Sequence, residues 1–244
     1  MSTAVVQTYS QKVGFPRLKP SNFFSLWSFE NNLIDSIGSN DLTQVQGGNN
    51  YPPGLIGDSK VFSNNTLEAN NDMSLSFTDG VNDIEGGFSM LIRFNSTGNQ
   101  WLINKRDGFG ESGLLKNEHQ LAYYLGNLQF VIFDQVNGGY IIVIYSWTPT
   151  LFQDYHIQCY YDGSGLHTGL KMYIDGISVG TTSLTGTYVS NQNYNTKLVI
   201  GSNSWNRGFP FYGRLDEIKK SKIALTDAEA LELATKELSG IKVI

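Results

Sequence analysis

The sequence predicts an all-β fold built from antiparallel strands, and three observations carry this prediction. Short segments rich in aromatic and β-branched residues recur along the chain between clusters of turn residues. Two pairs of these segments are joined by Asn-Gly or Asp-Gly turns, which tolerate the positive φ angles of tight hairpins. One convincing helix follows the strands near the C-terminus, and helices do not alternate with strands, so a parallel α/β sheet is disfavoured.

The expected strands are short and are separated by turns from residue 23 onward. They comprise residues 23–29, 88–94, 101–104, 128–133, 140–145, 170–174, 177–179, 198–200 and 211–218. Asn137 and the two glycines after it connect one pair of strands, while Asp175 and Gly176 connect another. Both turns carry residue types that adopt positive φ at low cost, so each pair is expected to form a hairpin.

One helix is expected after the last strand. Thr226 followed by Glu229 is the sequence signature of a capping box, in which side chains and backbone satisfy each other's hydrogen bonds. Leu231 and Leu238 would lie on one flank of this helix, and Gly240 ends the pattern. The helix is therefore predicted between Thr226 and Gly240.

The chain is expected to contain one sandwich domain, residues 23–244, preceded by an extended arm, residues 1–22. The arm contains Gly14, Pro16 and Pro20 and lacks a sustained alternation of apolar and polar residues. Segments of this kind are ordered mainly by docking onto another surface. The arm is therefore interpreted as an anchor.

The composition favours binding by hydroxyl and amide groups over binding by charge. Charged residues make up only 16% of the chain, and the formal net charge is −5. Because no basic stripe is present, a nucleic-acid partner is not expected. No segment has the apolar length of a membrane span, and the N-terminus lacks the basic start and apolar run of a secretion signal, so synthesis in a cytoplasm is expected.

The order of these segments resembles the laminin-G-like jelly-roll domains of the concanavalin A-like lectin and glucanase superfamily. In that family an aromatic strand ending in an acidic residue precedes a turn of Asp, Ser, Gly and Asn, as in residues 26–30 and 35–42 here. A strand and turn similar to residues 170–176 follow, and residues 211–218 resemble the last strand before a short helix. The resemblance covers residues 23–238 and implies a jelly-roll sandwich of two antiparallel sheets.

The same superfamily contains β-glucanases, so an enzyme has to be weighed. Their catalytic strand resembles Glu-x-Asp-x-Glu, which places an acid and a nucleophile on one face. The nearest segment here has Asp83 and Glu85, but Val81 stands in place of the first carboxylate. A non-enzymatic module is therefore expected, with a carbohydrate-active enzyme or its accessory carbohydrate-binding module as the alternative.

The resemblance also implies a metal. Some laminin-G-like domains hold Ca²⁺ near the rim of the sandwich, with oxygen ligands from carboxylates and backbone carbonyls. Glu30, Asp35 and Asp216 occupy acidic positions similar to those of the family, which makes Ca²⁺ the candidate cofactor. In the alternative interpretation Asp35 caps a turn and Asp216 pairs with a neighbouring Arg or Lys.

A saccharide site needs an aromatic plane for the sugar ring and polar side chains for its hydroxyl groups. The loop of residues 201–208 offers these groups together in Trp205, Asn206 and Arg207. Tyr51, which lies among Asn and Pro residues, is a second aromatic candidate. In the alternative interpretation Trp205 covers the end of the sandwich or lies in a subunit contact.

Together these features favour a structural or adhesion protein of a virion, such as a bacteriophage head fibre, decoration protein or tail appendage. In this interpretation residues 1–22 dock onto other virion proteins, and the sandwich faces outward toward a cell-surface glycan. A homo-oligomer is expected, and a trimer is the specific prediction. The virion assignment depends partly on where similar domains occur.

Overall fold

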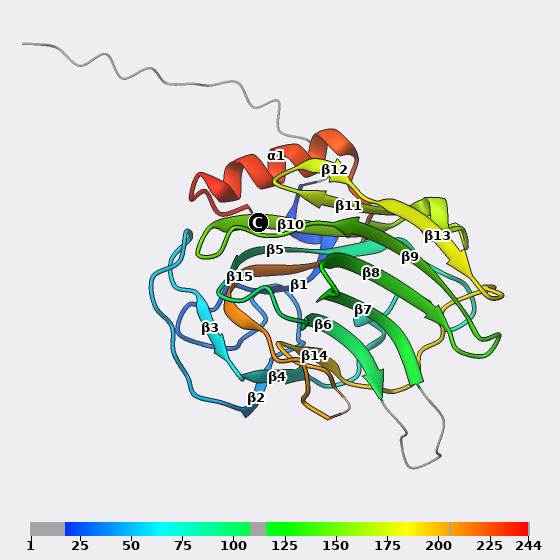
Figure 1. Ribbon diagram of the computed structural model, residues 1–244, viewed down its shortest axis with the longest axis horizontal. Helices are drawn as coiled ribbons and strands as arrows, with labels where there is room; N and C mark the ends of the chain where they lie inside the picture. The colour runs from blue at the N-terminus through cyan, green and yellow to red at the C-terminus, as the bar shows by residue number, and fades with distance from the viewer. Residues whose placement is uncertain (1–17, 108–115, 205, 244) are drawn as a thin grey trace, which may run out of the picture.

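The computed structural model describes residues 18–107, 116–204 and 206–243. Within these ranges the chain forms two antiparallel sheets that pack face to face, with a C-terminal helix on the outside (Figure 1). This arrangement is the all-β sandwich that the sequence predicts. Its core lies between the sheets, which leaves the outer face of each sheet to meet a helix, a loop or a ligand.

The smaller sheet carries the strands on which the helix packs. In spatial order it contains β1 (Phe23–Trp27), β15 (Tyr212–Ser221), β5 (Gly86–Phe94), β10 (Asp154–Tyr161), β11 (Leu170–Ile174) and β12 (Ile177–Val179), and β3 (Lys60–Ser63) also pairs with β15. Strands β1 and β15 are neighbours although they are far apart in the sequence. The two ends of the domain are therefore joined within one sheet.

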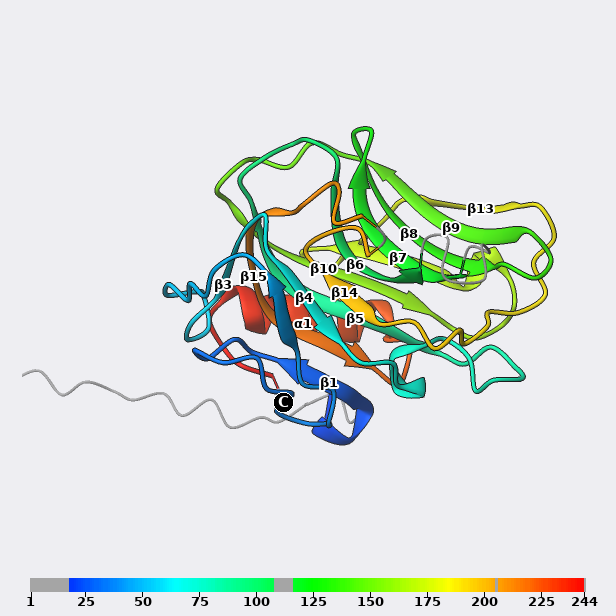
Figure 2. The ribbon, with the colours of Figure 1, turned by 90° about the horizontal axis from the view of Figure 1, so that it is seen from below.

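The larger sheet carries the candidate site. In spatial order it contains β13 (Thr181–Thr185), β9 (Gly139–Ser146), β8 (Asn127–Asp134), β7 (Lys116–Tyr124), β6 (Gln100–Asp107), β14 (Leu198–Ile200), β4 (Thr66–Ala69) and β2 (Thr43–Gln46). From β6 to β9, neighbours in space are also neighbours in sequence, and these strands lie side by side in one curved layer (Figure 2).

Helix α1 (Asp227–Leu238) covers part of the outer face of the smaller sheet. Its capping box is formed as predicted, because Thr226 and Glu229 exchange side-chain and backbone hydrogen bonds. Leu233 packs with Tyr160 of β10 and Tyr173 of β11 in a buried cluster on that face. Short 3₁₀ turns connect other elements: η1 (Pro20–Asn22), η2 (Met73–Leu75) and η3 (His167–Gly169).

Both predicted hairpins are confirmed. Strands β8 and β9 pair in continuous antiparallel register around the turn that contains Gly138. Strands β11 and β12 pair around Asp175 and Gly176, whose φ angles of +53° and +80° are those of a tight hairpin turn. The residue types at these turns therefore fixed the local conformation.

A bulge interrupts the pairing of β15 with β5 between Asp216 and Lys219. Glu217 lies in it with a φ angle of +47°. Bulges re-aim the side chains of a strand. Here Asp216 lines a small cavity under the loop of residues 54–59, whereas Glu217 forms an ion pair with Lys219.

Candidate functional site

The loop of residues 201–208, which is predicted to bind a saccharide, is held against β6 of the larger sheet. Asn104 Nδ2 donates to the Ser202 carbonyl at 2.7 Å, and the Ser204 amide donates to Asn104 Oδ1 at 3.1 Å. The Ser204 hydroxyl also donates to the Arg106 carbonyl. Asn104 and Arg106, which lie two residues apart on β6, therefore hold this loop onto the sheet.

The structure places Asn206 and Arg207 differently within this loop. The Arg207 guanidinium forms an ion pair with Glu68 of β4. Asn206 is exposed, and its Oδ1 accepts a hydrogen bond from the Gly208 amide at 2.9 Å. Trp205 lies outside the described residues. Arg207 is therefore the predicted ligand-binding residue whose side chain reaches across to another strand.

Tyr51 belongs to different surroundings. The Lys60 ammonium lies 4.5 Å from the centroid of the Tyr51 ring, and the Tyr51 hydroxyl donates to Asn49 Oδ1 at 3.5 Å. The ring also packs against the edge of the core. These contacts connect Tyr51 to the segment between β2 and β3 and do not bring it to the cavity beside Arg207.

A cavity of about 360 Å³ opens beside the loop of residues 201–208, and we call it the cationic cavity. It is lined by Glu68, Arg106, Asp107, Asn195, Thr196, Lys197, Val199, Ser204 and Arg207. Three of these residues are cations and two are carboxylates, which leaves one positive charge in excess. This local charge is opposite in sign to the net charge of −5 on the whole chain.

Glu68 fixes two of the cations. Its Oε2 accepts a hydrogen bond from Lys197 Nζ at 2.7 Å, and its Oε1 pairs with Arg207 Nη2. Burial acts to raise the pKa of Glu68, but hydrogen bonds from Lys197 and Arg207 outweigh it and lower this pKa. Glu68 is therefore a bound anion that orients the two cations.

A second cavity, of about 250 Å³, lies on the outer face of β6–β9, and we call it the aromatic cavity. It is lined by Arg106, Gln120, Gln129, Val131, Phe133, Tyr140 and Ile142. Successive side chains of a strand point to opposite faces, so Val131 and Phe133 point outward while Phe130 and Ile132 enter the core. The rings of Phe133 and Tyr140 pair with their centroids 5.8 Å apart.

Arg106 lines both cavities, which are therefore adjacent on the outer face of the larger sheet, and we call the two together the groove. Its guanidinium stacks on Trp101, 4.7 Å from the ring centroid, and its Nη1 donates to Gln120 Oε1 at 3.1 Å. Burial lowers the pKa of Arg106 from its usual value. Five strand spacings of about 4.8 Å separate β9 from β4, so the groove spans roughly 24 Å, enough for several sugar rings.

Two guanidinium nitrogens of the groove, Arg106 Nε and Arg207 Nη1, are buried and have no hydrogen-bond partner among the described residues. Arg207 also has a φ angle of +56°, which is strained for a residue with a side chain. Unsatisfied donors and strained backbone are uncommon in folded proteins and gather at functional sites. Both features occur together at the cationic end of the groove.

Asp35, one of the three predicted calcium ligands, uses both oxygens to hold its own loop. Its Oδ1 accepts hydrogen bonds from the amides of Leu26, Ile37 and Gly38 at 2.9–3.1 Å. Its Oδ2 accepts from the Asn40 amide at 3.1 Å. This is the turn-capping arrangement of the alternative interpretation, and it leaves little capacity for a metal ion.

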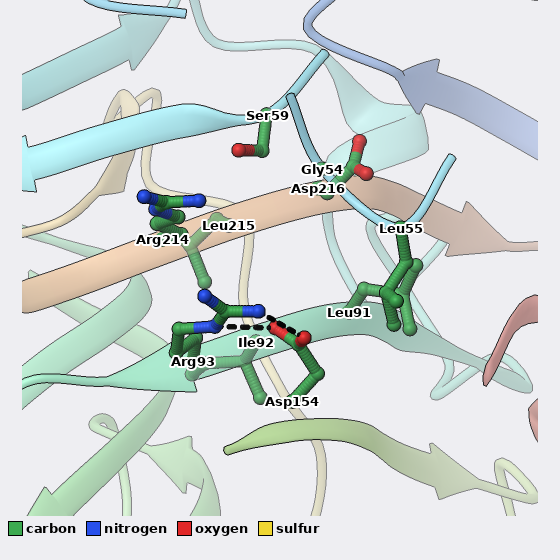
Figure 3. Close-up of a pocket in the computed structure, with 10 residues that line it drawn as sticks. All are labelled: Gly54, Leu55, Ser59, Leu91, Ile92, Arg93, Asp154, Arg214, Leu215 and Asp216. Atoms are coloured by element: carbon green, nitrogen blue, oxygen red, sulfur yellow. Dashed lines mark hydrogen bonds and ion pairs between the residues drawn. The ribbon is translucent and has the colours of Figure 1, made fainter. Parts of the chain in front are cut away.

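Glu30 and Asp216, the other two predicted ligands, contact the same loop of residues 54–59. Glu30 Oε2 accepts a hydrogen bond from the Asp58 amide at 3.1 Å. Asp216 lies beside Gly54 at a cavity of about 20 Å³ (Figure 3). Within the described residues, no group of three or more His, Cys, Asp and Glu side chains is arranged to hold a metal ion.

The Asp216 carboxyl is buried and only half satisfied. Its Oδ1 accepts a hydrogen bond from the Glu217 amide at 2.8 Å, and the Ile56 amide also acts to stabilise the ionised carboxyl, whereas Oδ2 has no hydrogen-bond partner among the described residues. Burial and the neighbouring charge of Glu217 raise the pKa of Asp216 to about 8. The nearby guanidinium of Arg93 is engaged with Asp154 (Figure 3). An unpaired carboxylate oxygen in a small cavity fits a proton or a cation.

The carboxylates considered for glycan hydrolysis have structural contacts. Asp83 Oδ2 accepts hydrogen bonds from the hydroxyls of Tyr161 and Tyr188 at 2.5 and 2.7 Å, and its Oδ1 accepts from the Asn191 amide. Glu85 Oε2 accepts from a backbone amide of the segment before α1. Neither carboxylate lines the groove.

Comparison with known sequences identifies the family. The sequence family described as the concanavalin A-like lectin/glucanases superfamily matches residues 57–230, which is more than half of the chain. The chain therefore belongs to this superfamily, and its sandwich is a lectin-like one. None of the curated protein sequences compared with the chain matches it. Across the described residues no helix has both the length and the apolar character needed to cross a membrane.

Solved structures show the same fold. Domain 4 of a GH43 extracellular arabinanase from Geobacillus stearothermophilus, in complex with arabinotriose, has a TM-score of 0.62 and 19% identity, covering 87% of this chain and 98% of that one. The binding domain of Paraclostridial Mosquitocidal Protein 1 has a TM-score of 0.69 and 17% identity, covering 91% of this chain and 56% of that one. The receptor-binding domain of botulinum neurotoxin D has a TM-score of 0.60 and 16% identity, covering 90% of this chain and 54% of that one.

This chain therefore spans about half the length of the two toxin structures. At these identities the likeness concerns the fold alone.

Sequence reasoning missed most residues of the groove. Phe133 and Tyr140 lie within expected strands, and no local motif marks them as ligand contacts. A signal was available on β8, where Gln129 occupies the face opposite to the apolar core residues and Phe133 follows at the same period of two. An outward-facing aromatic residue beside amide side chains is a candidate for ligand contact.

Proposed function

We propose that this chain is a carbohydrate-binding module without catalytic activity, and that a saccharide chain binds along the groove of the larger sheet. The observation that carries this proposal is the combination of aromatic and amide side chains in the aromatic cavity. The rings of Phe133 and Tyr140 offer apolar planes to the C–H faces of sugar rings, and the amides of Gln120 and Gln129 offer partners to hydroxyl groups.

The electrostatics of the groove support binding rather than hydrolysis. A glycosidase needs a carboxylic acid whose raised pKa lets it protonate the leaving oxygen. Glu68, which lies in the groove, is held as a carboxylate by Lys197 and Arg207, and these contacts lower its pKa. Asp83, the better match to the glucanase pattern, lies outside the groove.

The solved structures of similar fold also support a binding role. One is an arabinanase domain in complex with arabinotriose, and others are described as binding or receptor-binding domains of toxins. A lectin-like sandwich that presents one curved face to a polymer is a common basis for such recognition. We infer an adhesion role for this chain by analogy with these domains.

The expected attachment to a virion, as a trimer docked through residues 1–22, stays a prediction of the sequence. Residues 1–17 of this arm lie outside the described part of the chain. Residues 18–22 belong to that part, where Leu18 packs beside the cluster under α1 and the Asn22 carbonyl accepts a hydrogen bond from the Lys222 amide.

The variant Tyr140→Ala tests the proposed function. Removing the ring deletes one wall of the aromatic cavity, and loss of one aromatic stacking partner is expected to weaken saccharide binding by roughly tenfold. Binding is measured first on a glycan array that includes arabinan, β-glucan and polygalacturonate, and then by titration calorimetry with the best ligand.

Tyr212→Ala provides the matched control, because Tyr212 is a half-exposed tyrosine on β15 of the smaller sheet, with 42% of its surface accessible. The control variant should bind as the wild type does, and both variants should keep the thermal stability of the wild type within a few degrees. The proposal fails if the wild-type protein binds no saccharide, or if Tyr140→Ala and Tyr212→Ala bind equally well.

A further inference from the structure

We propose that the saccharide bound in the groove is anionic, and that its acidic group is held in the cationic cavity between Arg106 and Arg207. This inference depends on the proposed function and adds the class of ligand to it. The acidic group is a carboxylate, as in a uronic acid, or a sulfate ester, because both present planar or tetrahedral oxygens to a guanidinium.

Charge is distributed unevenly along the groove. The aromatic cavity contains one charged side chain, Arg106, at the boundary that it shares with the cationic cavity. The cationic cavity gathers Arg106, Lys197 and Arg207 around two carboxylates. A saccharide with an acidic group is therefore bound with that group toward β4 and β14 and with its sugar rings over β8 and β9.

The cations of the cationic cavity also retain hydrogen-bonding capacity. Glu68 uses one oxygen for Lys197 and the other for Arg207, so it has little capacity for a third cation. Arg106 Nε and Arg207 Nη1 are left without acceptors among the described residues. Part of the charge of each guanidinium is therefore left without an acceptor, and an oxyanion at the cavity side of the guanidinium compensates this charge more strongly than a neutral sugar hydroxyl does.

Arg106, where the two cavities meet, is also partly removed from water. Arg106 is stacked on Trp101 and bound to Gln120, so its position is fixed before a ligand arrives. A guanidinium that is partly removed from water attracts an anion more strongly than an exposed one does. Lys197, whose side chain is 55% exposed, would contribute mainly to salt-dependent attraction at longer range.

The experiment compares polygalacturonate with its fully methyl-esterified form, which has the same rings without the charge. Dextran sulfate tests the sulfate source, and linear arabinan is a neutral reference. Wild-type protein is expected to bind polygalacturonate or dextran sulfate at least about tenfold more tightly than either neutral polymer. The charged ligand that binds more tightly identifies the acidic group, and its affinity should fall as salt is raised.

Two substitutions are predicted to change the affinity for the charged polymer in opposite directions. They distinguish residues that contact the ligand from residues that only support the loop. Arg207→Gln removes a cation and is expected to weaken binding of the charged polymer by roughly tenfold. Glu68→Gln keeps the shape of the side chain but removes the competing anion, so binding should strengthen by roughly threefold. Arg214→Gln, on β15 of the other sheet, is the matched control and should leave binding unchanged.

Equal binding of polygalacturonate and its methyl ester would overturn the anionic assignment while leaving the proposed function in place. Weaker binding by both Arg207→Gln and Glu68→Gln would also overturn it, since that pattern indicates that the ion pair only shapes the loop. Absence of binding to every polymer would instead contradict the proposed function itself.

Discussion

At the scale of single residues, Asp216 is a titrating group with a predictable effect on stability. Burial and the neighbouring Glu217 raise its pKa in the folded chain to about 8, from an ordinary value of 3.8. The folded chain therefore keeps a proton that the unfolded chain releases between these two values. The stabilisation is fully present below about pH 4 and is lost as the pH rises through about 8.

Asp216→Asn is expected to remove this dependence, because an amide has nearly the same shape and no charge. Relative to the wild type, the variant should gain stability between pH 5 and pH 8.5, as measured by thermal unfolding at both pH values. Glu30→Gln serves as the control at an exposed carboxylate that contacts the same loop. A wild type and an Asp216→Asn variant that respond to pH in parallel would show that another group titrates.

The same measurement tests whether Ca²⁺ binds at Asp216, as the resemblance to laminin-G-like domains implies. A bound Ca²⁺ would favour the ionised form of Asp216, so added Ca²⁺ should raise the melting temperature of the wild type at pH 8.5 and have less effect at pH 5. Asp216→Asn should lose this response. A wild-type melting temperature that is the same in excess Ca²⁺ and in excess EGTA would contradict the calcium assignment.

Residue types also explain why one strand could not be predicted from the sequence. Strand β7 was not expected, because its first five residues are all polar. The structure buries Glu118 of this strand against Lys105, with Nζ–Oε1 at 2.7 Å and both side chains without exposed surface. A buried ion pair hides the alternation of apolar residues on which strand prediction depends, and its partner on β6 could not be identified from the sequence.

At the scale of secondary-structure elements, turn and cap residues were the most informative part of the sequence. The two hairpins and α1 were predicted from Asn-Gly, Asp-Gly and Thr-x-x-Glu patterns, which act locally. Strands β2, β3, β4 and β13 were missed, since they are only four or five residues long and β2 and β13 are largely exposed. Their pairing is set by neighbouring strands rather than by their own residues.

The turn between β11 and β12 also contacts α1, and this makes a specific prediction. A Cβ atom on Gly176 would lie 2.6 Å from Leu231 Cα, and the φ angle of +80° disfavours any side chain. Gly176→Ala is therefore expected to lower the free energy of unfolding by about 2–3 kcal/mol, as measured by urea denaturation.

Gly126→Ala separates the cost of a side chain at a positive φ angle from the cost of a close contact with α1. Gly126 has a φ angle of +74°, but a Cβ atom there would meet no atom within 4 Å. This substitution should lower the free energy of unfolding by about 1 kcal/mol, because only the positive φ angle opposes the new side chain. Equal losses for the two variants would show that the contact between the turn and the helix relaxes without cost.

At the scale of the whole molecule, the sandwich could be predicted but the groove could not. Glu68, Arg106 and Arg207 come from β4, β6 and the loop after β14, and only the register of the larger sheet brings them together. The sequence signal at Arg207 was the local mixture of Trp, Asn and Arg. The aromatic cavity depends on which face of β8 and β9 points outward, which is fixed by packing against the other sheet.

The two outer faces of the sandwich therefore present different surfaces. The smaller sheet carries α1 over Tyr160 and Tyr173. The larger sheet carries a groove in which aromatic, amide and cationic side chains follow one another across the strands. The central claim is that this outer face of the larger sheet holds a saccharide.

The most direct test is a crystal structure of the protein with an oligosaccharide of the tightest-binding polymer. The account predicts sugar rings against Phe133 and Tyr140, with an acidic group within hydrogen-bonding distance of Arg106 or Arg207. A ligand bound only at the loops around Asp83, or on the smaller sheet, would contradict it.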